Sequence, residues 1–551
     1  MIFERIFILK DIIRMKSKDK FTTIIILFLS LLFGTFTGIL TLAGFFWINR
    51  YPLDFTEGFV DTFHDSPLLN LLTTAIVCIL AYLIIFLFKK IKKQEMIVHL
   101  ISAVFTFLML AFLILFVYKC KCEPVCDQMQ LVLDAIFFKN GNYEDMLGYM
   151  RTYQHQYGLV FLEEMVMRIK EDWRIFQYLN AFFVSGGIYA MYRITRELFQ
   201  KPVVSLISVL FAITFVPLYF YTNFVYGEVP SLAFGMYGIW LVILFLKKRE
   251  KRFINKKNWF YLVGAVILLT LSYLARTNMI ILLTALALAV CVYAIREKRY
   301  PALICAVLFL IVPILVNTGV KKSYELRSGY SIGSSEPTLA RIAMGMQHSE
   351  MGYGFFNGYA DFIFNTTAAY DTEVANQIYK EEIAYRLDGF KTEPRSAYVF
   401  YKLKMMQQWN EGTFGSIVST NAFIDSKPGE NVRKLYSEEY GKYINAFCNR
   451  YVAVVYFMFF AYAVFRIIRL IKSLIQKKEE EWSVEFDYLL MIYFIGGFLF
   501  SLLWEAKPRY VFPYVYVCLP LAAMGLYQIS EKAEAAISKI SKKKNKEGKD
   551  E

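Results

Sequence analysis

Long apolar segments alternate with short polar connections along almost the whole chain. Twelve of these segments have the length of about 20 residues that an α-helix, rising 1.5 Å per residue, needs to cross a bilayer. The pattern therefore predicts an all-α polytopic membrane bundle of about 12 transmembrane helices. The predicted spans are approximately residues 22–47, 67–88, 97–118, 173–192, 203–221, 228–246, 258–275, 278–295, 301–319, 449–465, 485–504 and 510–530.

The connections between these segments differ in charge in a regular way. Lys and Arg gather in every second short connection, such as 89–93, 193–201 and 247–257, and near both ends of the chain. The loop at 48–66 has the opposite balance, with one Arg against four acidic residues. Because cytoplasmic loops of membrane proteins are rich in Lys and Arg, this pattern predicts a multi-pass cell-membrane protein with both termini cytoplasmic. The first apolar segment is longer than the core of a cleavable signal peptide, so we expect a retained helix.

This topology divides the chain into five parts. Residues 1–95 form an N-terminal cytoplasmic segment with an extra transmembrane hairpin, and residues 96–319 form a transmembrane core with an outer loop at 119–172. An extracytoplasmic domain at 320–448 and C-terminal transmembrane helices at 449–530 follow. A basic cytoplasmic tail at 531–551 ends the chain.

The outer loop 119–172 contains two amphipathic stretches. Apolar residues from Val125 to Phe137 repeat at helical spacing and leave Asp127 and Asp134 off the apolar stripe. A second stretch, 159–169, is too short to span and places Glu163 and Glu164 on its polar side. Both stretches predict helices that lie in the membrane interface, although packing against the bundle explains the apolar stripe equally well.

Composition narrows the range of functions. The chain is 57% hydrophobic, its mean hydropathy is +0.40, and its formal net charge is +14. The basic residues lie in short loops between apolar segments, so they indicate orientation and no nucleic-acid partner. No phosphate-binding loop or dinucleotide-binding glycine pattern is present. Of the eight cysteines, Cys120, Cys122, Cys126 and Cys448 lie in predicted outer segments, where disulfides can form. The first three match no standard zinc spacing.

Three isolated charged residues lie at predicted outer boundaries of the bilayer. Asp127 follows the third span, where a partly desolvated carboxylate can act as a general base toward a hydroxyl. Glu228 begins the sixth span and Arg276 interrupts almost forty apolar residues, so Arg276 requires a partner, either a phosphate or Glu228. The alternatives are a loop acid or helix N-cap for Asp127, a helix-start acid for Glu228 and a polar turn residue for Arg276.

A second group of candidates lies between the last two spans. Lys507, Arg509 and Tyr510 occupy a short outer loop, where the charge rule disfavours cations. The planar guanidinium of Arg matches phosphate oxygens and Lys adds a point charge, so this loop predicts a phosphate-binding site. The alternative is that both side chains extend to the interface from a helix end.

Histidine is scarce, and two of the four lie in predicted outer segments. His155 stands beside Gln156, and His348 lies in the 320–448 domain. Neither has a second metal ligand at helical spacing, so no metal site is predicted, although a divalent cation is compatible with the remaining acids.

Several of these segments together resemble the GT-C superfamily of membrane glycosyltransferases, including the bacterial protein O-mannosyltransferase and aminoarabinose-transferase branches. The resemblance covers about residues 97–530 and rests on an Asp soon after a spanning helix (Cys126-Asp127-Gln128) and on four further segments, all on one predicted face. These segments are 153–158, 223–228, 344–359 and 507–513. Many members of the superfamily have Glu where this chain has Gln128.

The resemblance implies a glycosyltransferase that moves a sugar from a polyprenyl-phosphate donor to an acceptor hydroxyl of the cell envelope, with inversion. It assigns Asp127 as the catalytic base, and it places Glu228, Arg276, Lys507, Arg509, Tyr510, His155, Gln156 and His348 at substrate. Two other classes remain open. One is a transporter or flippase of a lipid-linked glycan, although such proteins place ionisable groups near the bilayer midplane. The other is a non-catalytic accessory protein with an outer domain.

Overall fold

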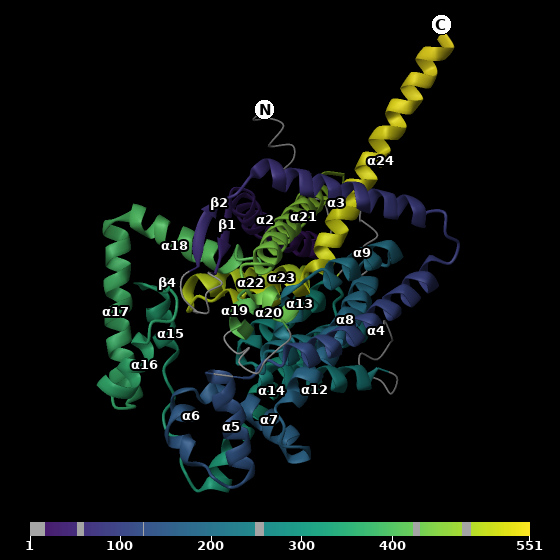
Figure 1. Cartoon of the computed structure of the whole chain (residues 1–551). Helices are drawn as coiled ribbons and strands as arrows, with labels where there is room; N and C mark the ends of the chain where they lie inside the picture. The colour runs from purple at the N-terminus through teal and green to yellow at the C-terminus, as the bar shows by residue number, and fades with distance from the viewer. Residues whose placement is uncertain are drawn as a thin grey trace.

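The computed structural model describes residues 17–51, 60–124, 126–247, 258–421, 430–476 and 486–550 (Figure 1). Parts of the charge pattern, including residues 1–16, 52–59 and 248–257, lie outside this range, as does Val125, and the tail side chains after Ser541 are not described. The chain is almost entirely helical. Its long helices are α2 (Ser17–Phe46), α3 (Pro67–Phe88), α4 (Gln94–Cys120), α8 (Arg174–Phe199), α11 (Glu228–Lys247), α12 (Trp259–Ala275), α13 (Ile280–Arg296), α14 (Leu303–Ser328), α17 (Thr372–Thr392), α21 (Gly441–Gln476), α22 (Asp487–Leu503) and α24 (Leu519–Asp550).

Shorter elements connect the long helices. The described strands form two antiparallel hairpins, β1 (Trp47–Arg50) with β2 (Asp61–His64) and β3 (His348–Ser349) with β4 (Gly352–Tyr353). The shorter helices and turns are α5 (Asp127–Lys139), η1 (Glu144–Leu147), α6 (Tyr149–Thr152), η2 (Gln154–Gln156), α7 (Tyr157–Ile169), α9 (Pro202–Ile213), α10 (Pro217–Tyr221), η3 (Thr277–Met279), η4 (Tyr300–Ala302), α15 (Thr338–Gly345), α16 (Tyr359–Phe362), η5 (Ile363–Thr367), α18 (Pro394–Trp409), α19 (Ser416–Asn421), α20 (Glu430–Tyr436), η6 (Pro508–Tyr510) and α23 (Phe512–Val517).

Each of the twelve predicted spans falls on a helix or a broken helix, but not all of them are long and apolar enough to cross a membrane. Within the described ranges seven helices meet both criteria: α2, α3, α4, α11, α13 with η3, α14 with η4, and α21. An eighth span results if η6 with α23 and the start of α24, which bend by 53° at their junction, are counted as one. Helices α9, α12 and α22 are apolar but shorter. The structure is therefore typical of a multi-pass membrane protein, and the count of twelve spans is not confirmed.

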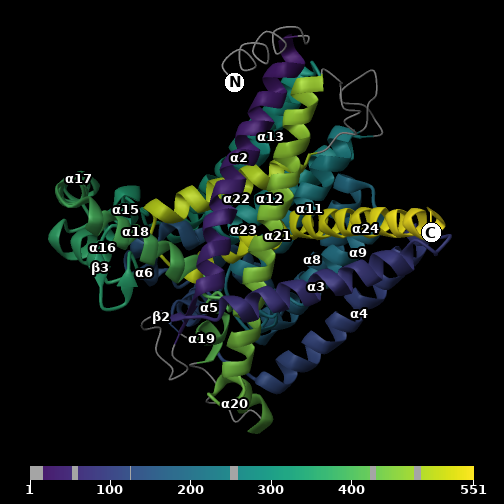
Figure 2. The ribbon, with the colours of Figure 1, turned by 90° about the horizontal axis from the view of Figure 1, so that it is seen from above.

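Helices α2 and α21 form the longest contact in the bundle and run side by side (Figure 2). Small residues on α2 allow this close approach, because a Cβ on Gly34 would lie 3.2 Å from the Cβ of Ala463, and one on Gly44 would lie 3.3 Å from Ala453. In lipid, where burial of apolar surface drives little association between helices, such close packing supplies much of the attraction.

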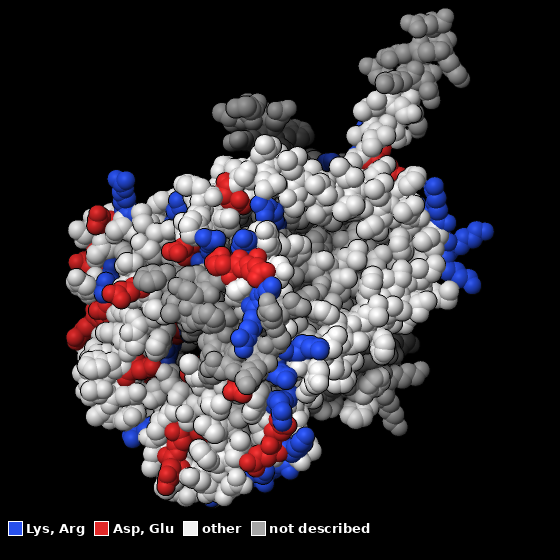
Figure 3. Space-filling view, viewed as in Figure 1, with Lys and Arg blue, Asp and Glu red and all other residues white. Residues whose placement is uncertain are grey.

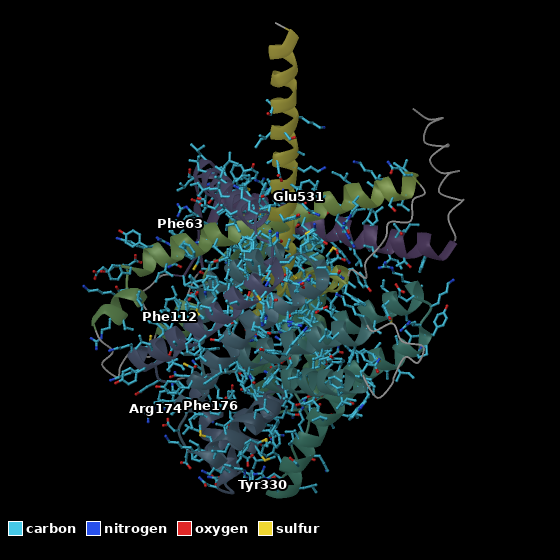
Figure 4. The ribbon with its side chains drawn as sticks, turned by 90° about the vertical axis from the view of Figure 1, so that its right-hand side faces the viewer. Phe63, Phe112, Arg174, Phe176, Tyr330 and Glu531 are labelled. Atoms are coloured by element: carbon cyan, nitrogen blue, oxygen red, sulfur yellow. The ribbon has the colours of Figure 1, made fainter. Side chains whose placement is uncertain are left out.

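The outer surface of the bundle is apolar over α3 and α4. Large side chains such as Leu68 (66% exposed) and Phe107 (68% exposed) point outward there, and charged residues are sparse over this side in Figure 3. A soluble protein rarely exposes so wide an apolar surface, whereas lipid tails cover it without cost. Helix α24 starts inside the bundle and projects from it beyond Glu531, at the end opposite to Tyr330 (Figure 4).

Residues 338–409 form a separate group of helices, α15 to α18, at one side of the bundle (Figure 1). Helix α18 leads from this group back to the bundle, where it packs on α22 and α2. The β1–β2 hairpin joins α2 to α3 and approaches the C-terminal end of α18, where Asn49 pairs with Glu411. The group therefore stands beside the connections between the long helices.

The outer loop 119–172 is helical as predicted, with α5 and α7 as its main elements, but its buried faces differ from the prediction. Asp134, Glu163 and Glu164 are all buried rather than on a polar face. The reason is tertiary: Glu164 accepts hydrogen bonds from Tyr324 (2.7 Å) and Arg327 (2.5 Å) of α14. Such partners, 160 residues away, leave no trace in the local spacing.

A buried ion pair inside the bundle provides a test of this packing. Arg466 of α21 and Asp487 of α22 are both fully buried, with 2.9 Å between Arg466 Nη2 and Asp487 Oδ1. Removal of one partner leaves a buried charge, so Asp487→Leu should destabilise the protein by about 3–5 kcal/mol. The double variant Arg466→Met/Asp487→Leu should recover most of that loss. Thermal unfolding in detergent measures both, and Glu534→Gln, which breaks the exposed pair with Lys89, is the matched control. An Asp487→Leu variant as stable as the control would contradict the buried pair.

Candidate functional site

Three connections between long helices meet at Glu228. They are the segment 222–228 before α11, the turn at Arg276 between α12 and η3, and the 505–510 segment between α22 and α23. A Cβ on Gly227 would lie 2.0 Å from the carbonyl oxygen of Ala275, so only glycine permits this contact between two backbones. From α8, Asn180 Nδ2 donates to the carbonyls of Thr222 (3.3 Å) and Phe224 (3.0 Å) and holds the first segment in place.

Glu228 lies between two arginines. Its side chain is completely buried and forms an ion pair with Arg276, and Arg509 Nε lies 3.8 Å from its Oε1. The guanidinium carbon of Arg276 lies 5.1 Å from the ring centroid of Tyr510, and that of Arg509 lies 5.6 Å from the centroid of Tyr226. One carboxylate thus faces two cations among aromatic rings. We call Glu228, Arg276, Arg509, Tyr226 and Tyr510 the Glu228 group.

A second buried cation extends this network. Arg341 of α15 pairs with Glu336 (3.0 Å), Asp361 (3.1 Å) and Glu505 (3.3 Å). Glu505 Oε1 also accepts a hydrogen bond of 3.3 Å from the Tyr510 hydroxyl, which connects Arg341 to the Glu228 group. Burial, opposed by Arg341 and reinforced by Asp361 and Glu505, raises the pKa of Glu336 to about 7.

Asp127 is the first residue of α5 and is exposed. The preceding Cys126 has φ 48°, a conformation that L-residues rarely adopt and that turns the chain sharply into the helix. An acid in the first turn of a helix complements the helix dipole, which is also the structural role of such a residue. Tyr149 is its neighbour: burial first, and then Tyr226 and Asp127, raise the pKa of Tyr149, so the hydroxyl stays protonated beside the carboxylate.

Tyr226 lies close to both Asp127 and Arg509. Burial first, and then the Asp127 carboxylate, raise the pKa of Tyr226, while Arg509 lowers it. The Gln156 amide donates a hydrogen bond to the Tyr226 hydroxyl. One tyrosine is therefore near an exposed carboxylate and near a buried cation.

His155 is next to this network. The ring has an exposed edge, and its centroid lies 6.1 Å from that of Tyr153, whose hydroxyl donates a hydrogen bond to Asp361. Loss of solvation, and then the charges of Arg341, Lys321 and Arg276, lower the pKa of His155 to about 3. His155 is therefore neutral at physiological pH and can donate or accept a hydrogen bond without adding charge.

Lys507 lines a narrow pocket of about 40 Å³ together with Arg509. The remaining wall is mostly apolar and aromatic, formed by Tyr51, Met351, Phe355, Phe356, Gly415, Val418 and Ser419. We call it the cationic pocket. It has room for a few water molecules only, so any larger ligand must widen it.

His348 lies apart from the other candidates. It is on β3, and its ring lies against Tyr353 of β4, with 4.2 Å between centroids and the planes tilted by 34°. Both rings line another pocket, whose walls come from β2, the β3–β4 hairpin and α18. The structure therefore brings Asp127, Gln156, Glu228, Arg276, Arg509 and Tyr510 together, with His155 and Lys507 beside them, and places His348 elsewhere.

Sequence reasoning missed Tyr149, Tyr226 and the Arg341 network. Tyr226 stands two residues before Glu228, and its neighbour Gly227 is the more informative signal. Arg341 interrupts an apolar stretch, Thr338-Leu339-Ala340 before it and Ile342-Ala343-Met344 after it, as Arg276 does, and the same argument could have found it. The three acids around Arg341 come from different segments and have no local signal.

The structure contains no group of three or more His, Cys, Asp or Glu side chains that could hold a metal ion within the part of the chain that it describes. Within the described residues, Cys120, Cys122, Cys126 and Cys448 are not joined in disulfides. No protein-family model, curated protein or solved structure matches this chain.

The raised pKa of Glu336 predicts a pH effect on stability. Between pH 4.5 and about 7 the folded protein binds a proton at Glu336 that the unfolded chain releases, so stability from this group is lost as pH rises. The melting temperature of the wild type should therefore fall more between pH 5 and 7.5 than that of Glu336→Gln, which cannot titrate. Comparison of the two proteins cancels the contribution of every other group. If the melting temperatures of the two proteins changed with pH in parallel, Glu336 would be ionised in the folded protein throughout this range, which would contradict the raised pKa.

Proposed function

We propose that this chain is a membrane glycosyltransferase that moves a sugar from a polyprenyl-phosphate donor to an acceptor hydroxyl at the extracytoplasmic face, with inversion at the anomeric carbon. The observation that carries the proposal is the cationic pocket, where Lys507 and Arg509 stand at an apolar and aromatic wall. A lipid phosphate needs both surfaces, since its phosphate requires cations and its chain requires apolar contacts. A free sugar nucleotide would not need the apolar wall.

The proposed reaction is a single displacement. Asp127 accepts the proton of the acceptor hydroxyl while the oxygen attacks the anomeric carbon and the bond from that carbon to the phosphate oxygen breaks. The electron pair of this bond leaves with the polyprenyl phosphate, which gains negative charge. Arg509 and Lys507 stabilise that negative charge. Fixed cations in a site without bulk water lower the activation barrier more than the same cations would in water.

The arrangement around Tyr226 supports this division of roles. Asp127 is accessible, as a base for an incoming acceptor should be, whereas Arg509 is buried, and both lie close to Tyr226. Glu228 pairs with Arg276 and lies 3.8 Å from Arg509, which holds both guanidinium groups near the pocket. A donor phosphate would meet them there.

The topology follows the same proposal, with about twelve membrane crossings, both termini cytoplasmic and residues 320–448 outside. Cysteines introduced at 247–257 and after Lys542 should resist impermeant thiol reagents in intact cells, whereas cysteines introduced at 330–440 should react. A Cys126→Ser background removes the exposed native thiol. Reaction in the reverse pattern would move Asp127 and Arg509 to the cytoplasm and exclude an extracytoplasmic reaction.

Asp127→Asn should abolish most transfer without a change in expression, because an amide cannot accept the acceptor proton. General-base loss reduces rates by about 10²- to 10⁴-fold. The measurement is turnover of a radiolabelled polyprenyl-phosphate sugar by purified protein, with Asp172→Asn, an acid of the same loop, as control. Near-normal turnover in Asp127→Asn would assign the base to another group.

Arg509→Lys distinguishes phosphate binding from simple charge at a helix end. Lysine keeps the charge but cannot offer two parallel donors, so the variant should lose about 10²-fold in turnover. If the loss appears instead as weaker donor affinity, Arg509 binds the phosphate equally before the transition state. Arg174→Lys, at an exposed site, is the control. Full activity of Arg509→Lys would exclude a two-donor contact.

One observation favours a second function, transport of a lipid-linked glycan. The break of 53° between α23 and α24 follows directly on η6, which contains Arg509, and transporters often bind substrates at discontinuous helices. An enzyme turns over in detergent, whereas a transporter has a measurable activity only across a sealed membrane. Product formation in detergent therefore separates the two functions.

A further inference from the structure

A second pocket lies beside the proposed site and not within it. It has a volume of about 650 Å³ and is lined by Val60, Asp61, Thr62, His348, Ser349, Glu350, Gly352, Tyr353, Leu403 and Gln407. We call it the hairpin pocket. Ligand sites of drug size or a few sugar rings have volumes of about 300–1,000 Å³.

The buried side-chain amide of Gln407 holds the walls of the hairpin pocket together. Gln407 Oε1 accepts a hydrogen bond of 3.1 Å from the backbone nitrogen of Tyr353, and its Nε2 donates one of 3.1 Å to the carbonyl of Val60. Gln407 thus ties α18 to both hairpins. A pocket whose walls are held in this way needs little reorganisation to bind a ligand.

The walls combine aromatic rings with acceptors. His348 and Tyr353 form a tilted pair, and Phe400 meets the Tyr353 ring edge to face, with 5.7 Å between centroids. Asp61 and Glu350 are exposed at the same pocket, and neither Lys nor Arg is among its lining residues. Aromatic rings take the C–H face of a sugar, and carboxylates accept hydrogen bonds from neighbouring hydroxyls.

The two pockets lie on either side of one short segment. Gly352 and Tyr353 line the hairpin pocket, whereas Met351, Phe355 and Phe356 line the cationic pocket. The backbone nitrogen of Ala506 donates a hydrogen bond of 2.7 Å to the carbonyl of Gly354, which attaches this segment to the loop of Lys507 and Arg509. A molecule in the hairpin pocket is therefore next to the place where the donor phosphate is proposed to bind.

We infer that the hairpin pocket binds the acceptor and that the acceptor is a neutral or amino-substituted glycan. The assignment of the ligand as an acceptor rests on the proposed function, whereas the class of ligand follows from the residues of the pocket. The carboxylates of Asp61 and Glu350 exclude acidic glycans, because no lining cation offsets their charge. The β1–β2 hairpin supplies Asp61 and Thr62 to this pocket and therefore contributes to acceptor specificity.

Binding measured without any donor tests this inference separately from transfer. Purified full-length protein in detergent is applied to an array of neutral, amino and acidic glycans, and the strongest ligand is then titrated calorimetrically. We expect saturable binding of neutral or amino glycans and none of sulfated or carboxylated ones. Asp61→Asn and Tyr353→Ala should each weaken binding at least tenfold, and Asp61→Asn/Glu350→Gln should admit acidic glycans.

Controls of the same chemistry lie outside the pocket. Asp388→Asn and Tyr398→Ala change exposed residues of α17 and α18 and should bind as the wild type does. Because Asp61 is exposed, its variant keeps the fold even if Tyr353→Ala does not. No glycan binding, equal loss in the controls, or preferred binding of a trilysine peptide would overturn the inference. Glycan binding without sugar transfer would leave the pocket assigned and contradict the proposed function alone.

Discussion

A carboxylate buried among helix ends is the constraint on which the rest of the site depends. Glu228 is removed from water at the first turn of an apolar helix, and a lone buried charge is strongly unfavourable. It is stable there because Arg276 and Arg509, from two other connections, pair with it. The pairs therefore select a single arrangement of α11, α12 and α23, and the close backbone contact of Gly227 with Ala275 completes it.

The same constraint determines what charge the site offers. Two arginines face one carboxylate, and Glu505 connects this group through Tyr510 to Arg341 and its acids. Neutral His155 and protonated tyrosines surround these residues without adding charge. An anionic leaving group could use this environment, which is why a lipid phosphate suits the site better than a neutral substrate.

Part of this organisation could be read from the sequence. The span predicted at 67–88 coincides with α3, and the acid Glu228 indicates the start of α11. The pairing of Arg276 with Glu228 was one of the two partners that an isolated arginine allowed. Long apolar segments, and single charged residues within them, are local features, so they can be recognised in the sequence without knowledge of the fold.

The remainder depends on contacts between distant segments. The partner of Glu164, Arg327, is 163 residues away, so local spacing predicts a polar face where the structure has a buried one. The hairpin that turns His348 into a pocket beside the Glu228 group likewise has no local signal. The count of twelve spans is not confirmed, because α9, α12 and α22 are apolar but short. In each case tertiary packing decides the outcome.

The most direct test of this account is a double-mutant cycle on Glu228 and Arg276. Unfolding is measured for Glu228→Gln, Arg276→Gln and the double variant, and the coupling between the two changes gives the strength of the pair. The account predicts a coupling free energy of about 1.5 kcal/mol or more, toward the upper part of the range for contacting residues. Effects that add to within about 0.5 kcal/mol would show that Glu228 does not hold the connections together.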